Sequence, residues 1–103
     1  MGFDEYQEKA ATFRTESADH WYAIINLPGE VGELSSLIAK GVRDGFLEDY
    51  LPNVRKELGD ILWHIAAIAD DHQINLSDIA EGNIAKLQSR KDRDVIKGSG
   101  DNR

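Results

Sequence analysis

Two stretches of this chain carry apolar residues at helical spacing, and each apolar stripe is bordered by a pair of carboxylates. Apolar residues that recur at steps of about 100° mark an amphipathic helix. The alternation of apolar and polar residues that a half-buried strand needs is missing, so we expect an all-α fold. The stripes consist of Leu27, Val31, Leu34, Leu37 and Ile38 in the first stretch and Val54, Leu58, Ile61, Leu62, Ile65, Ile68 and Ala69 in the second.

The bordering carboxylates are Glu30 with Glu33 and Glu57 with Asp60. Residues three apart on a helix lie on one side, with about 5–6 Å between their Cβ atoms. In a chain with 30% charged residues, either pair alone is more commonly a solvated face. Solvated charges usually lie opposite the stripe, however, whereas these lie at its border. If the two stripes pack together, the four acids converge into a set of hard oxygen ligands suited to Mg²⁺. Beside carboxylates, this ion usually holds the phosphates of a substrate.

Two side chains beside the second carboxylate pair need a separate interpretation. Trp63 lies opposite the apolar stripe, which indicates a second face to cover, and we expect a subunit interface there. His64 falls between Glu57 and Asp60 in angle. A single histidine near a core is more often a structural hydrogen-bonding group than a ligand, so we assign it a minor role.

The apolar periodicity and the residues that start and end helices predict four helices in one domain of residues 1–103. Pro28 leaves two alternatives for the second helix, which either begins there or continues an upstream turn with a kink. Ser77 is the expected N-cap of the fourth helix. The tail, residues 95–103, contains Gly-Ser-Gly and is expected to be flexible or ordered by a ligand. The predicted helices run from Phe3 to Arg14, Ala18 to Val42, Pro52 to Asp71 and Asp78 to Lys91.

Composition excludes several classes of function. The net charge of −7 argues against duplex nucleic acid as a partner, because that binding depends on Lys and Arg that neutralise phosphates. No segment has the roughly 18 apolar residues of a membrane helix, and the first residues do not have the pattern of a secretory signal. The chain has no Cys and therefore no disulfide framework or thiolate zinc site. We expect a cytoplasmic, soluble protein.

Length and charge distribution point to partners of two kinds. A chain of 103 residues buries only about 60–65% of its unfolded surface, so we expect copies of the chain to complete the core as a homodimer or homotetramer. Six of the 12 Lys and Arg residues lie between Ile84 and Arg103. A basic tail beside an acidic centre would suit a polyphosphate bound with Mg²⁺, although composition alone would favour a solvated tail.

These residues together resemble the MazG-like, all-α nucleoside triphosphate pyrophosphohydrolases. Glu-x-x-Glu is followed, after 23 residues, by Glu-x-x-Asp on a second helix. The resemblance covers most of the chain from Leu27 onward, with departures at Pro28 and at Asp94, where a glycine is expected. It extends through Lys56–Trp63, Asn83–Leu87, Arg90 and the closing Gly98–Arg103.

The resemblance implies a four-helix, bundle-like fold completed by oligomerisation and a set of site residues. Mg²⁺, with Mn²⁺ as an alternative, would be held by Glu30, Glu33, Glu57 and Asp60, one of which would act as the base. The substrate would be a nucleoside triphosphate, cleaved between its α and β phosphates to monophosphate and pyrophosphate. Phosphate-facing positions are Asn83, Lys86 and Arg90, with Lys86 in the catalytic set, and the closing tail contributes Lys97, Asp101 and Arg103.

The sequence does not determine which residues recognise the nucleobase, and it leaves two alternative functions open. The N-terminal third offers stacking surfaces and polar groups for a nucleobase, which are Phe13, Trp21, Tyr22, Gln7 and Asn26. One rival is a related pyrophosphohydrolase that acts on phosphoribosyl-ATP or on dUTP. The other is a non-enzymatic helical dimerisation module whose acids are solvated.

Overall fold

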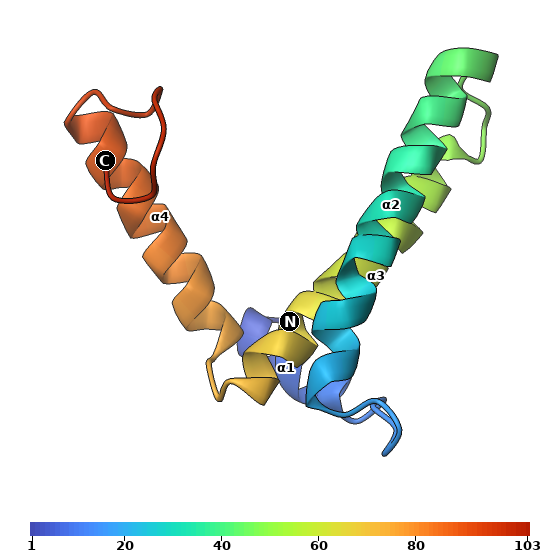
Figure 1. Cartoon of the computed structure of the whole chain (residues 1–103), viewed down its shortest axis with the longest axis horizontal. Coiled ribbons are helices and arrows are strands. Elements are labelled where there is room, and N and C mark those ends of the chain that lie inside the picture. The colour runs from blue at the N-terminus through green and yellow to red at the C-terminus, as the bar shows by residue number, and fades with distance from the viewer.

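A computed structural model of the chain describes residues 1–103, apart from the side chain of His20. The described residues form four helices and no strand, which confirms the all-α prediction. Turns and short loops join the helices (Figure 1). Their bounds are Phe3–Ala11 for α1, His20–Asp44 for α2, Tyr50–Asp71 for α3 and Leu76–Asp92 for α4.

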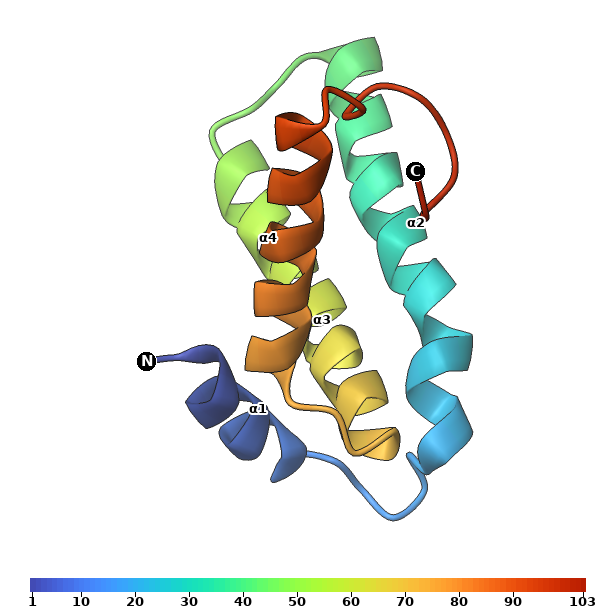
Figure 2. The same ribbon diagram turned by 90° about the vertical axis from the view of Figure 1, so that its left-hand side faces the viewer.

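The longest two helices, α2 and α3, form an antiparallel hairpin that carries both carboxylate pairs (Figures 1 and 2). Helix α2 ends at Asp44 and is capped by Gly45, whose φ of 101° lies in the region that favours glycine. Its N–H bonds to the carbonyl of Gly41 at 2.8 Å. The ring of Phe46 packs on Gly41, where a side chain would not fit, and stacks edge-on against Tyr50. This turn brings the two helices side by side.

The structure decides between the two alternatives for the second helix and corrects the start of the fourth. Helix α2 runs without a break from His20 through Pro28, which excludes a start at Pro28, although the proline supplies no N–H to the preceding turn. Helix α4 begins at Leu76 with Asn75 as its N-cap, so the assignment of Ser77 as N-cap is wrong. The Ser77 N–H and hydroxyl instead donate to the Asp4 carboxylate, at 3.2 and 2.8 Å.

Helix α1 covers the face of α3 that carries Trp63. The indole N–H of Trp63 donates to the Ala10 carbonyl at 3.2 Å, and the side chain is half-buried. Within the single chain, α1 covers part of the face that carries Trp63, and the subunit interface expected there stays a prediction. Sequence periodicity gave the second buried face correctly but could not identify what covers it.

The side chain of Gln7 fastens α1 to the turn between α3 and α4. Its amide N–H groups donate to the Asp70 carboxylate and the Ile74 carbonyl, both at 2.9 Å. Its amide oxygen accepts from the Leu76 N–H at 2.8 Å. Both Gln7 and Leu76 are buried, so the start of α4 is held against α1.

Helix α4 diverges from the α2–α3 hairpin, and the chain has the shape of an open V (Figure 1). Helix α4 packs on α1 at its base, whereas α2 and α3 pack on each other along their length. Parts of the predicted stripes are consequently open, with Val31 exposed by 43% and Leu58 by 50%. The described part of a single chain thus gives four helices without the closed bundle that the resemblance implies.

Among the described residues, no helix combines the length and apolar character that crossing a membrane would require.

Candidate active site

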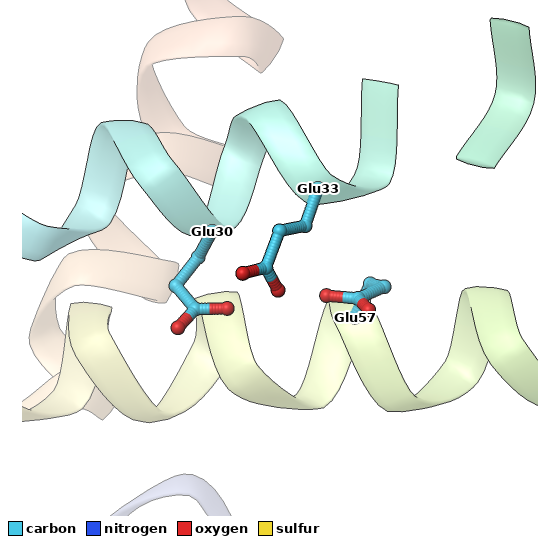
Figure 3. Close-up of side chains that lie close together, drawn as sticks. All are labelled: Glu30, Glu33 and Glu57. Carbon is cyan, nitrogen blue, oxygen red and sulfur yellow. The ribbon is translucent and has the colours of Figure 1, made fainter. Parts of the chain in front are cut away.

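Three of the four predicted carboxylates meet on the α2–α3 hairpin. Glu30 and Glu33 extend from α2 toward α3, and Glu57 extends from α3 to meet them (Figure 3). One carboxylate oxygen from each lies within 4.8 Å of the other two. This spacing lets the three groups share one cation, since Mg²⁺ and Mn²⁺ favour several oxygen ligands.

Two oxygens of this cluster lack a partner. Oε2 of Glu30 and Oε2 of Glu57 are both buried and accept no hydrogen bond from the described residues. Buried polar atoms in folded proteins are nearly always satisfied, so each unsatisfied oxygen indicates a group that the polypeptide itself does not supply. A divalent cation fits that role because it would bind both oxygens and offset the repulsion among the acids.

The electrostatics of the cluster agree with a cation site. Burial raises the pKa of Glu30 above its usual value, and the nearby charges of Glu33 and Asp60 raise it further. The pKa of Glu57 is raised by burial first, then by the close carboxyl group of Glu33 and by the charges of Glu33, Asp60 and Glu30. Without a cation, these carboxylates hold protons more tightly than exposed acids do.

Asp60, the fourth predicted ligand, lies beside the cluster. It is exposed and is outside the group of three whose oxygens approach within 4.8 Å. Its charge nevertheless raises the pKa of both Glu30 and Glu57, so it belongs to the same electrostatic environment. Asp60 remains a predicted ligand, placed one helical turn from Glu57.

A polar pair on the inner side of the hairpin contacts the cluster. The amide nitrogen of Asn26 lies 2.9 Å from Nε2 of His64 and 3.4 Å from Oε1 of Glu30. Nδ1 of His64 lies 2.7 Å from the Asp60 carbonyl oxygen. The sequence interpretation missed this arrangement, although Asn26 and Glu30 share the four-residue spacing that signals contact on a helix.

The predicted phosphate-binding cations lie on α4 and contact the tail. Lys86 Nζ is 3.1 Å from Asp101 Oδ1, and Arg90 donates to the carbonyl and to Oδ1 of Asp101, at 2.6 and 3.1 Å. Hydrogen bonds from Lys86 and then Arg90 lower the pKa of Asp101. Arg90 is buried, and its Nε has no hydrogen-bond partner among the described residues.

The rest of the tail folds back on the end of α4. Arg103 donates to the carbonyls of Val95 and Ile96, at 3.0 and 2.9 Å, while Arg93 donates to the Arg103 carbonyl. Asp94 has a φ of 56°, which explains why a glycine would suit this position. Asn83 and Lys97 are exposed.

The single chain does not bring the cations of α4 to the carboxylates of the hairpin. The two sets lie on different arms of the V, which diverge away from α1 (Figure 1). The predicted ligands on the hairpin gather into a cluster, and the predicted phosphate contacts Lys86, Arg90 and Asp101 gather into another.

A comparison with known families bears on this constellation. The model of the MazG nucleotide pyrophosphohydrolase domain matches residues 19–94 of the chain. The chain belongs to the MazG family. The match spans α2, α3 and α4 and so contains both the carboxylate cluster and the cations of α4. It bears out the resemblance drawn from the sequence.

A relative of this MazG chain occurs in a bacteriophage. The gene 37 protein of Mycobacterium phage L5 is 41% identical over 85 residues, which cover 80% of this chain and 75% of the phage protein. No solved structure matches the chain significantly.

The residues suggested for base selection separate in the structure of this MazG domain. Phe13 and Tyr22, together with Trp63, Thr15 and Ser17, line a cavity of about 280 Å³ beside the start of α2. Trp21 lines a different cavity with Ile24 and Ile68. Gln7 is used in the turn before α4, and Asn26 contacts Glu30, so neither faces the aromatic cavity.

Proposed function

We propose that this MazG-family protein hydrolyses (deoxy)nucleoside triphosphates to the monophosphate and pyrophosphate with the help of Mg²⁺, or alternatively Mn²⁺. The observation that carries the proposal is the meeting of Glu30, Glu33 and Glu57 with two buried, unpartnered oxygens. We propose that the domain extends beyond the matched residues 19–94 and comprises residues 1–103.

In this proposal the four carboxylates have two roles. Glu30, Glu33, Glu57 and Asp60 hold the cation, which when bound supplies charge neutralisation for the triphosphate and lowers the pKa of the attacking water. One carboxylate of the set accepts the proton of that water as it attacks.

The residues of α4 and the tail bind the phosphates. Lys86 and Arg90 lie one helical turn apart and place two positive groups on the leaving pyrophosphate, with Asn83 as a further donor. In the structure the Asp101 carboxylate is paired with both cations. A bound phosphate would therefore have to displace Asp101 or share Lys86 and Arg90 with it. Lys97 and Arg103 are proposed to complete the contacts from the tail.

A second copy of the chain is proposed to complete the site as a homodimer or homotetramer. A compact protein of 11.5 kDa exposes about 5,800 Å², whereas this chain exposes 7747 Å². Its radius of gyration is 16.6 Å, against about 13 Å for a compact chain of this length. The excess of about 1,900 Å² is more than the roughly 800 Å² that one partner buries in a standard interface.

The open V suggests how two copies would meet. Helix α4 of one copy would lie against the α2–α3 hairpin of the other, which would cover the open stripes and bring Lys86 and Arg90 to carboxylates across the interface. Light scattering over a concentration series tests this assembly. A strict monomer at about 10–50 µM, where a functional dimer should persist by mass action, would refute it.

The reaction is tested by identifying the products. The protein is incubated with each canonical nucleoside triphosphate and Mg²⁺, and the products are separated by chromatography. We expect nucleoside monophosphate and pyrophosphate, and nucleoside diphosphate with orthophosphate as first products would refute the assignment. A panel that includes dUTP, phosphoribosyl-ATP and damaged nucleotides separates the related activities.

The non-enzymatic alternative rests on the same open surface. A helical dimerisation module would need the apolar faces but not the unpartnered carboxylate oxygens. Absence of pyrophosphate release from every substrate in the panel, with a stable dimer present, would favour this alternative.

A further inference from the structure

We infer that Asn26 is a positioning residue for the carboxylate Glu30, and that His64 in turn fixes Asn26. The inference deepens the proposed function and rests on it, because it assigns a support to one ligand of the proposed cation site. The three groups are connected by two hydrogen bonds across the α2–α3 hairpin, of 3.4 Å from Asn26 to Glu30 and 2.9 Å between Asn26 and His64.

The direction of each hydrogen bond follows from donor chemistry. Nδ1 of His64 lies 2.7 Å from the Asp60 carbonyl, which can only accept, so Nδ1 carries a hydrogen. The amide nitrogen of Asn26 faces both Nε2 of His64 and the Glu30 carboxylate. An amide NH₂ group has two hydrogens, so one is donated to each neighbour, and Nε2 must present its lone pair.

The opposite orientation of the Asn26 amide would be unfavourable. It would place the amide oxygen against the carboxylate of Glu30, with two acceptors facing each other. The Nδ1–H form of His64 therefore selects the orientation in which Asn26 donates to Glu30. A side chain at this position that only packed, without a hydrogen-bond acceptor, would not determine the orientation of the Asn26 amide.

The surroundings of His64 hold its ring in place. The side chain is 5% exposed. The ring of Tyr22 stacks on it at 6.3 Å between centroids, and the ring of Trp63 meets it edge-on at 5.1 Å. A buried ring that lies beside two aromatic side chains and is bonded to its own helix is a well-positioned acceptor for Asn26.

The register of the hairpin produces this arrangement. Asn26 precedes Glu30 by one turn on α2, and His64 follows Asp60 by one turn on α3. Because the helices are antiparallel, the two supporting residues meet at the same level. Asn26 uses Oε1 of Glu30, which leaves the unpartnered Oε2 available to a cation. Groups that orient a ligand in this way commonly change metal affinity by about 10–100-fold.

The test measures Mn²⁺ affinity by calorimetry, together with kcat, KM and the melting temperature. We expect Asn26→Leu to weaken Mn²⁺ binding about tenfold, near the lower limit for outer-shell partners because the bond to Glu30 is long. The fall in turnover should come mainly through kcat when Mn²⁺ is subsaturating. Asn75→Leu, which changes an asparagine before α4 whose side chain makes no capping hydrogen bond, is the control and should leave Mn²⁺ affinity unchanged.

Variants of His64 separate positioning from packing. His64→Gln retains an acceptor near the position of Nε2, so its Mn²⁺ affinity should stay within about twofold of the native value. His64→Leu should weaken binding about as much as Asn26→Leu. The double variant should be no weaker than Asn26→Leu alone, because His64 acts through Asn26.

Four outcomes would overturn the inference. If Asn26→Leu binds Mn²⁺ with native affinity, Asn26 has no positioning role. If the affinity loss of the double variant equals the product of the losses of the two single variants, His64 does not act through Asn26. A lowered melting temperature in His64→Leu with unchanged Mn²⁺ affinity would leave His64 as a packing residue only. A native protein that binds no Mn²⁺ would overturn the proposed cation site as well, whereas the first three results would leave that site standing.

Discussion

The two arms of the molecule treat their charged residues in opposite ways. On the α2–α3 hairpin, three carboxylates face one another, and two of their oxygens are buried without a partner. On α4, the cations Lys86 and Arg90 are paired with Asp101 of the tail. Among the described side chains, no cation pairs with the three carboxylates of the hairpin, whereas Lys86 and Arg90 have Asp101 as their counter-charge.

The difference predicts different responses to ligands. Burial, followed by the like charges held together, raises the pKa values of Glu30 and Glu57 and disfavours the folded state when both are ionised. A cation added to this arm should therefore stabilise it. On α4 the cations are already paired with Asp101. The net binding free energy of a phosphate there is therefore only the amount by which its contacts exceed the existing contact with Asp101.

The largest effect is expected from Glu57→Gln, which keeps the shape of the side chain and removes one charge. Turnover should fall by more than about 100-fold, beyond the usual effect of losing an outer-shell partner. Without metal, the variant should melt at the same temperature as the native protein or higher. Mg²⁺ should raise its melting temperature less than it raises that of the native protein.

Glu48→Gln is the control for charge alone, because Glu48 is exposed in the loop between α2 and α3. It should keep both the metal response and the turnover. If Glu57→Gln behaves like Glu48→Gln, the hairpin has no cation site and its acids are merely solvated.

On the other arm, Lys86→Ala should slow turnover by roughly 10- to 100-fold, the value of one hydrogen bond to a charged group. The circular dichroism spectrum should be unchanged, because Lys86 contributes charge rather than packing. Lys91→Ala, also on α4 but exposed, should be close to native. Equal kinetics for the two variants would return Lys86 to the solvated surface.

The open face of α4 gives a third prediction. Ile84 is 65% exposed in the single chain, so Ile84→Glu should be tolerated by the isolated fold. If a second copy covers this face, the variant should weaken association by about tenfold or more, from the loss of one buried side chain in each chain. Sedimentation measures the shift. An unchanged dimer would place the interface elsewhere.

The smallest effect is expected from pH. The folded-state pKa of Glu57 is raised above the usual 4.5, so the folded state binds this proton more tightly than the unfolded state does. Its stabilising contribution is present below pH 4.5 and is lost as pH rises through the raised value. The metal-free native protein should therefore lose stability over that interval relative to Glu57→Gln.

Saturating Mg²⁺ should reverse this trend, because the cation binds the deprotonated carboxylates. Melting curves at several pH values, with and without Mg²⁺, compare the two proteins. Parallel curves for native protein and Glu57→Gln would contradict the assigned electrostatics.

The sequence predicted the carboxylate cluster because helical periodicity is a local property. Glu30, Glu33 and Glu57 border the stripes through which α2 and α3 pack, so their convergence follows once the hairpin forms. The same periodicity placed Asp60 just beyond the edge of the stripe, and its side chain lies outside the closest group. The exact separation depends on the rotation of α3, which angular position in the sequence does not specify.

The parts that the sequence did not predict depend on contacts between distant segments. Ser77 has the chemistry of an N-cap, yet Asp4 from the other end of the chain takes its hydrogen bonds. Trp63 was assigned to another subunit because nothing local indicates that α1 returns to α3. The direction of α4 has the same origin, since its own pattern identifies a helix but not its docking angle.

The attachment of Gln7 bears on the order in which the chain folds. Its hydrogen bonds to Asp70 and Leu76 span 63 and 69 residues of sequence. Contacts of such long range close slowly compared with those of a helical hairpin joined by a short loop. During synthesis, α1 leaves the ribosome before α4. It can orient α4 only after Leu76 has been synthesised, because Gln7 bonds to the Leu76 N–H. We therefore expect the acidic hairpin to assemble before the basic arm is aligned.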